Sequence, residues 1–87
     1  MKPSTLLKHY NWCRYASAKD ADGYKVRPKN PKAKSFCVIG AALKCGVLTK
    51  LRKAWNKKYD KTSMVDWNDY TAHSKTQVID RLKLLGF

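Results

Sequence analysis

Apolar residues recur at helical spacings near both ends of this 87-residue chain. Near the N-terminus, apolar positions three and four residues apart predict one helix from Ser4 to about Ala18. Toward the C-terminus, Ser74-x-x-Gln77 matches a capping box and precedes an apolar stripe of helical period. We expect this last helix to end at Gly86.

The middle of the chain holds its most apolar stretch, Phe36 to Leu43. A helix that is apolar on every side lies inside a core, so this stretch predicts a buried central helix. Asn30-Pro31 suits an N-cap followed by a first-turn proline, and Gly46 suits a C-terminal stop. We therefore expect this helix to run from about Pro31 or Ser35 to Cys45.

A third helix is predicted from Lys50 to about Tyr59, capped by Thr49 and packed through Leu51 and Trp55. Residues 62–73 are expected to form a connecting segment without a helix of its own.

The apolar pattern stops between Lys19 and Lys34, where Asp22-Gly23 marks a turn and two prolines interrupt any helix. We expect a basic loop here, or a small hairpin through Tyr24 and Val26. Together the segments predict an all-α fold: a compact bundle of about four short helices around a buried central helix. Residues 1–87 are expected to form a single domain, in keeping with the usual size of one hydrophobic core.

The charge of the chain adds a functional prediction to this predicted fold, namely that the protein binds a partner. Nineteen Lys and Arg residues face six acidic residues, a formal net charge of +13, and such an excess predicts an anionic partner. The charge is concentrated on the third helix, which lacks acidic residues, and on the loop. Exposed Tyr24 or Tyr15 would stack on a base. The predicted contact residues are Lys50, Arg52, Lys53, Lys57 and Lys58 on the helix, and Lys25, Arg27, Lys29, Lys32 and Lys34 in the loop.

Three cysteines, Cys13, Cys37 and Cys45, include no C-x-x-C pair, which disfavours a zinc site or a disulfide framework. Reduced thiols favour the cytoplasm, that of the host if the chain is phage-encoded. The N-terminus lacks the apolar run of a signal peptide, and we expect neither a membrane partner nor a cofactor. The oligomeric state stays open.

One enzymatic alternative uses Cys37 as nucleophile and His73 as base, with Asp66, Asn68 or Asp69 orienting the imidazole. The apolar surroundings of the cysteine disfavour it, because a buried thiol is inert. A metal site at Asp66, Asp69 and His73 is also disfavoured, because such residues more often cap turns. We therefore expect no metal and no catalytic residue.

Several short motifs follow one another along the chain: Trp12, Asp22-Gly23, Cys37-x-x-Gly40-Ala41, Trp67-Asn68-Asp69 and Thr76-x-Val78. This order resembles a family of small domains of unknown function in bacterial and phage genomes, marked by C-x-x-G-A and W-N-D, over Trp12 to Leu85. The resemblance implies a compact, mainly helical unit and supplies no activity. The strong basicity departs from the family and suggests a specialised use, such as host takeover or counter-defence.

The sequence thus favours a small, basic, non-enzymatic protein that binds nucleic acid, with phage regulation or host takeover as its role. A helix-turn-helix over Leu43 to Tyr59 would be one way to present its cations to a groove. The alternative is a phage inhibitor that docks on an acidic host protein surface. A Cys/His-dependent enzyme is the third hypothesis.

Overall fold

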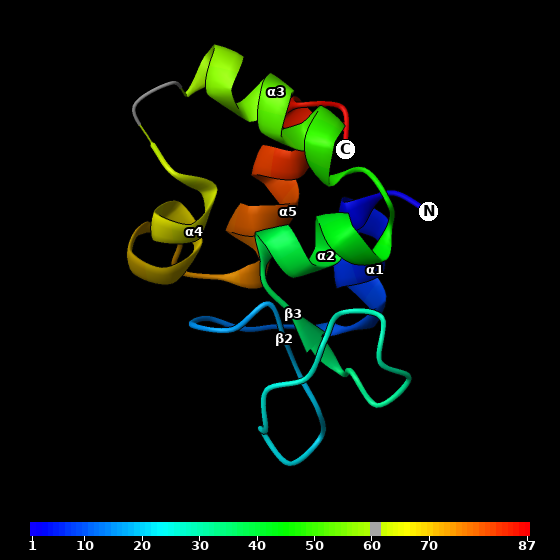
Figure 1. Cartoon of the computed structure of the whole chain (residues 1–87). Helices are drawn as coiled ribbons and strands as arrows, with labels where there is room; N and C mark the ends of the chain where they lie inside the picture. The colour runs from blue at the N-terminus through cyan, green and yellow to red at the C-terminus, as the bar shows by residue number, and fades with distance from the viewer. Residues whose placement is uncertain (60–61) are drawn as a thin grey trace.

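The computed structural model describes residues 1–59 and 62–87 and shows an α+β fold. The predicted all-α fold class is therefore wrong, because a small mixed sheet accompanies the helices (Figure 1). The strands are β1 (Asn11–Trp12), β2 (Ala18–Lys19) and β3 (Ser35–Phe36). The helices are α1 (Pro3–His9), α2 (Val38–Lys44), α3 (Leu48–Lys58), α4 (Met64–Asp66) and α5 (Lys75–Leu84), with a π-helical turn, η1 (Trp67–Thr71).

The sheet has the strand order β1-β3-β2, with β1 parallel and β2 antiparallel to β3. Phe36 at its centre is paired with Trp12 on one side and with Ala18 on the other. Each strand has only two residues. Alternation of apolar and polar positions needs a run of about four residues to become visible, so the pattern could not reveal this sheet.

The first helix is much shorter than predicted, because it ends at His9. Tyr10 has an extended backbone (φ −125°, ψ 169°), and the N–H of Asn11 donates to the carbonyl of Lys34 at 3.0 Å. The chain from residue 11 onward therefore pairs with β3 instead of continuing as a helix. Ala18, the predicted helix end, is buried in β2.

The buried central helix is confirmed, but its predicted start is wrong. The Asn30 side chain accepts a hydrogen bond from the Lys32 N–H at 2.8 Å in a local turn, so it caps no helix. Ser35 and Phe36 form a strand, and α2 begins only after Cys37. Its Val38, Ala41 and Ala42 are fully buried, whereas Leu43 is partly exposed. Gly46, with φ +73°, follows the helix as predicted.

The third helix is confirmed with shifted bounds, and it packs through Leu51 and Trp55 as predicted. Its N-cap is Val47, which supplies no side-chain hydrogen bond, so the predicted Thr49 cap is wrong. The predicted connecting segment is also wrong in part, because residues 64–71 are helical. The Ser63 hydroxyl accepts a hydrogen bond from the Asp66 N–H at 3.3 Å and caps α4.

The last helix is confirmed together with its cap. The Ser74 hydroxyl accepts from the Gln77 N–H at 3.2 Å, while the Gln77 side chain accepts from the N–H of His73 at 2.7 Å. Gly86, with φ +86°, follows the helix. The two chain ends meet beside it, because the N–H and the hydroxyl of Ser4 both donate to the carbonyl of Phe87 at 3.0 Å (Figure 1).

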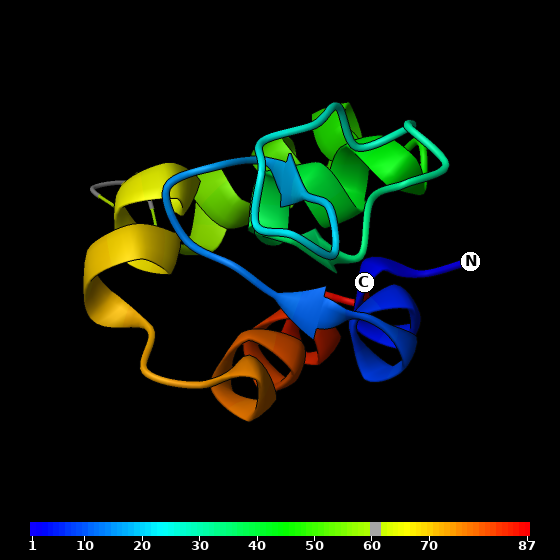
Figure 2. The ribbon, with the colours of Figure 1, turned by 90° about the horizontal axis from the view of Figure 1, so that it is seen from below.

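The basic loop extends from the sheet on the side opposite α3 in Figure 1, and Figure 2 shows it from below. It begins as a small hairpin, as predicted. The N–H of Asp20 donates to the carbonyl of Tyr24, the N–H of Val26 donates to that of Ala18, and Lys19 forms a β-bridge with Lys25. Across residues 1–59 and 62–87, no helix has the length and apolar character needed to cross a membrane.

Candidate nucleic-acid interface

All ten cationic side chains that the sequence predicts as contacts are exposed. On α3 the burial of Leu51 and Trp55 fixes which side of the helix faces the core. The span of α3 contains no Asp or Glu, so no carboxylate of the same helix neutralises its cations. All the charged side chains within α3 are therefore cationic.

The cations of α3 lie on different sides of the helix. Lys50, Lys53 and Lys57 are three and four residues apart, which aligns them along one face. We call these three residues the lysine stripe. Arg52 instead lines a hollow of about 240 Å³ together with Asn56 and Val65. The helix therefore presents one linear array of charge and one separate arginine at a concave site.

One loop cation lies near the start of α3: Lys29 lines a hollow of about 280 Å³ with Gly46 and Thr49, directly before Lys50. Lys57 and Lys58 lie at the other end of α3. The structure thus places Lys29 beside the α2–α3 turn, while the loop as a whole extends from the sheet on the side opposite α3 (Figure 1). The turn, residues 45–47, also has the short length expected of a helix-turn-helix, which stays a prediction.

Cys37 is a poor nucleophile in this fold. Its side chain is 7% exposed, and burial raises the pKa of its thiol to about 11. The thiol is therefore protonated at neutral pH. His73 lines the hollow beside Arg14 and Lys19, while the Cys37 sulfur accepts a hydrogen bond from the N–H of Gly40 instead of pairing with the imidazole. Cys13, Cys37 and Cys45 are free thiols.

The hypothetical metal ligands are not gathered either. Over the described ranges, no group of three His, Cys or Asp side chains has the arrangement of a metal site. Asp69 accepts hydrogen bonds from Asn68 and from the backbone of Tyr15, which is a structural use.

The C-x-x-G-A motif builds the start of α2. The Cys37 sulfur accepts a hydrogen bond from the N–H of Gly40 at 3.2 Å, which caps the helix. The N–H of Cys37 donates to the carbonyl of Ser17 at 3.1 Å. A Cβ atom on Gly40 would lie 1.7 Å from that same carbonyl oxygen. The motif therefore fixes α2 against the segment that leads into β2.

The W-N-D motif supplies a buried amide that joins three parts of the fold. Asn68 is 1% exposed, and its Oδ1 accepts from the indole N–H of Trp12 at 2.8 Å and from the N–H of Val38 at 3.0 Å. Its Nδ2 donates to the carbonyl of Cys13 at 3.1 Å and to Asp69 Oδ1 at 2.9 Å. Asn68 thus links η1 to β1 and α2. Nothing in the sequence around Asn68 indicates these distant partners.

The guanidinium of Arg81 in α5 packs on aromatic rings of the core. Its guanidinium carbon lies 4.0 Å from the Tyr59 ring centre, 4.2 Å from that of Trp67 and 5.1 Å from that of Trp55. Stacking of this kind stabilises an arginine on aromatic faces. Because the three rings come from two other segments, α3 with its C-cap and η1, no local pattern in the sequence indicated this role of Arg81.

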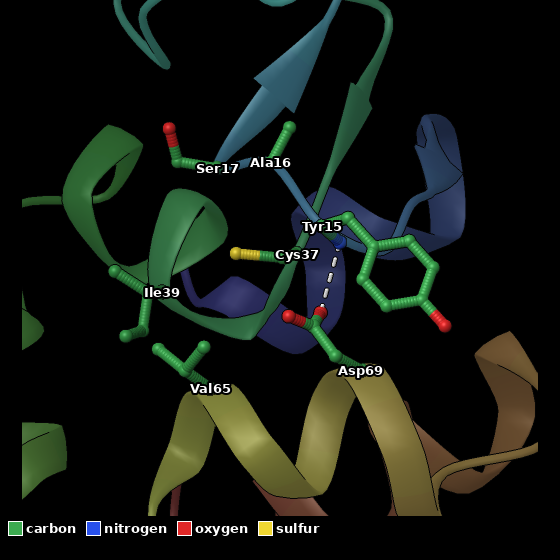
Figure 3. A pocket seen from close by; sticks show the side chains of 7 residues that line it. All are labelled: Tyr15, Ala16, Ser17, Cys37, Ile39, Val65 and Asp69. Carbon is green, nitrogen blue, oxygen red and sulfur yellow. Dashed lines mark hydrogen bonds between the residues drawn. The ribbon is translucent and has the colours of Figure 1, made fainter.

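Tyr15 is a functional candidate whose geometry the sequence did not indicate. It adopts φ +65°, and its N–H donates to Asp69 Oδ1 at 2.9 Å. It borders a hollow of about 230 Å³ whose other walls include Cys37, Ile39 and Val65 (Figure 3). The sequence did not indicate a role for Arg14 either. Its guanidinium donates to the carbonyl of Ala72, and its guanidinium carbon lies 4.9 Å from the Trp12 ring centre.

No protein-family model, no curated protein and no solved structure matches this chain. The family resemblance drawn from C-x-x-G-A and W-N-D therefore stays a hypothesis.

Proposed function

We propose that this chain is a small, basic, non-enzymatic protein that binds nucleic acid through the lysine stripe and the adjoining loop. The observation that carries the proposal is α3, which exposes five cations and has no acidic residue in its span. Its opposite face is fixed in the core by Leu51 and Trp55. The helix therefore holds its positive face in one orientation, as a phosphate-binding surface requires.

Electrostatics favours a polyanion as the partner. Helices that only face solvent usually pair Lys with Glu or Asp three or four residues away, and α3 has no such pair. Lysines that neutralise phosphates release counterions, which gives both affinity and a steep dependence on salt. Phosphate contacts of this kind position a protein without reading the base sequence. We infer a cytoplasmic setting, where the three thiols stay reduced.

The test is a salt titration of binding to a fluorescent DNA duplex, followed by anisotropy. We expect the logarithm of the binding constant to fall linearly with the logarithm of salt concentration. Three to five phosphate contacts predict a slope of about −3 to −5. Absence of binding at low salt, or binding that salt leaves unchanged, would overturn the proposal. A partner protein captured from lysate and retained after nuclease treatment would favour docking on an acidic protein instead.

A further inference from the structure

Three hollows on the surface adjoin one another, because each shares lining residues with the next. The hollow at Trp12, Arg14 and His73, of about 410 Å³, shares Tyr15 with the hollow at Cys37. The Cys37 hollow in turn shares Ile39 and Val65 with the hollow beside Arg52. We call these three hollows together the Tyr15 groove. It connects the sheet region to α3.

Two exposed aromatic rings lie at the Cys37 hollow: Tyr15 lines it, and Tyr70 contacts the Tyr15 ring. Tyr15 is 56% exposed and Tyr70 is 74% exposed, with ring centres 5.8 Å apart at an interplanar angle of 58°. Tyrosine is rarely found at φ +65°, and such a conformation persists only where its surroundings enforce it. The hydrogen bond to Asp69 does so here. The ring position is therefore set by the fold, and the exposed faces suit stacking on nucleobases.

The Cys37 hollow combines apolar walls with one anionic acceptor. Figure 3 shows the Cys37 sulfur pointing into the space bounded by Ser17, Ile39 and Val65. One Asp69 oxygen is bonded to Tyr15, while its other oxygen lies on the Cys37 side. A carboxylate repels phosphate but accepts hydrogen bonds from an exocyclic amine, as carboxylates do from the amine of cytosine. The hollow thus fits a flat base that carries an amine.

Positive charge lies at both ends of the groove. Arg14 and Lys19 line one end, and Arg52 lines the other. The Nε of Arg14 is buried and has no hydrogen-bond partner within residues 1–59 and 62–87. Cations that flank a stacking surface follow the sugar–phosphate backbone of a single strand. This charge distribution favours nucleic acid over an apolar peptide.

We propose that the Tyr15 groove binds a single-stranded segment of nucleic acid. An unpaired cytosine or adenine enters the Cys37 hollow with its amine on Asp69, and a neighbouring base stacks on Tyr15 and Tyr70. The flanking phosphates lie at Arg14 and Arg52. This inference rests on the proposed function and specifies its ligand. A duplex cannot make these contacts, because its base edges are paired and its faces are stacked.

The test compares an oligo-dC strand of about ten nucleotides, an oligo-dT strand of equal length and a duplex, all at one salt concentration. We expect oligo-dC to bind most tightly. Tyr70→Ser should weaken oligo-dC binding about tenfold, because base stacking on the ring is lost. The control is Leu84→Ser, since Leu84 is an exposed apolar side chain of α5 (68% exposed) that lies outside both the basic loop and the three hollows. It should change affinity less than about twofold.

Asp69→Asn tests the base preference. Asparagine keeps one oxygen to accept from Tyr15 and Asn68 and replaces the other with an amide donor, so the preference for oligo-dC over oligo-dT should disappear. Melting temperature confirms that each variant is folded. If this variant does not fold, the wild-type comparison still decides, since equal affinity for the two strands overturns the assigned base.

The outcomes separate this inference from the proposed function. Equal binding of single strands and duplex, with Tyr70→Ser indistinguishable from wild type, overturns the groove but leaves the lysine stripe as a nucleic-acid surface. Failure to bind any of the three oligonucleotides overturns both. If the groove instead binds a protein segment, none of the three oligonucleotides would bind. A partner protein would then be captured from lysate and retained after nuclease treatment.

Discussion

The junction around Asn68 and the surface of α3 contrast in how their side chains are used. At the junction, both polar atoms of the Asn68 side chain have identified partners in four hydrogen bonds, and Gly40 leaves no space for a side chain. On α3, the lysines extend into solvent along a helix without acidic residues. The junction therefore depends on close packing and directed hydrogen bonds, whereas the α3 surface depends on the charge of its side chains.

This contrast indicates that the short motifs of the chain specify its fold rather than its binding surface. C-x-x-G-A and W-N-D meet at the same junction, where Val38 donates to Asn68. Substitutions there should reduce stability, whereas substitutions in the lysine stripe should reduce binding and leave stability unchanged. The predictions below test that division, beginning with the largest change expected in the free energy of unfolding.

Gly40→Ala should have the largest effect, because the added Cβ would lie 1.7 Å from the Ser17 carbonyl oxygen. We expect a loss of about 3 kcal/mol or more, as in overpacked cores. Thermal unfolding should shift downward by roughly 15 °C. Gly46→Ala is the matched control, since Gly46 has φ +73° but open space around it. It should cost only about 1 kcal/mol. Equal losses in the two variants would contradict the close approach at Gly40.

Asn68→Ala should cost about 3 kcal/mol, because it leaves the indole N–H of Trp12 and the N–H of Val38 without their acceptor. Urea denaturation measures this loss. The control is Asn56→Ala on the exposed side of α3, which should change stability by less than about 0.5 kcal/mol. A small effect of the Asn68 variant would show that the junction does not depend on its amide.

Cys37→Ser should remove a pH dependence. The thiol pKa is about 11 in the folded chain against 9.0 as its ordinary value, so the folded state retains a proton that the unfolded state loses. Its contribution to stability is complete below about pH 9 and is lost as pH rises through 11, roughly 3 kcal/mol in total. Serine still accepts from Gly40 but does not titrate. Chemical denaturation of both proteins at pH 7, 9 and 10.5 measures the difference, and parallel curves would refute the assignment.

The triple substitution of Lys50, Lys53 and Lys57 by Gln should change the free energy of unfolding least, by less than about 0.5 kcal/mol. It should nevertheless reduce the salt-dependence slope of DNA binding by about 3. Replacement of Lys2, Lys8 and Lys83, which are also exposed, removes the same charge elsewhere. If both triple variants weaken binding equally, net charge rather than the lysine stripe carries the affinity.

The elements that the sequence predicted are those with a signal in neighbouring residues. The capping box at Ser74 and the apolar run from Phe36 to Leu43 lie within single segments, and both produced helices near the predicted positions. The exposure of the α3 cations was predictable for the same reason, because Leu51 and Trp55 define the buried face. The local periodicity of apolar residues therefore predicts much of the helical part of the fold.

The remaining features depend on partners far away in the sequence. β1 forms because residues 11–12 pair with residues 35–36, and a segment of two residues is too short to carry a sequence pattern that predicts this pairing. Asn68 bonds to Trp12 across 56 positions, and Arg81 stacks on three rings from two other segments. The left-handed conformation of Tyr15 depends on Asp69, 54 positions away. Only the tertiary fold could reveal the Tyr15 groove.

The contact between Ser4 and Phe87 has a consequence for engineering this molecule. With both hydrogen bonds converging on the Phe87 carbonyl, the ends are close enough to join through a short flexible linker. New termini can then open in the exposed loop near Lys29, where insertion and permutation are usually tolerated. A circular permutant of this kind would keep α3 intact while detaching one half of the loop cations from the other.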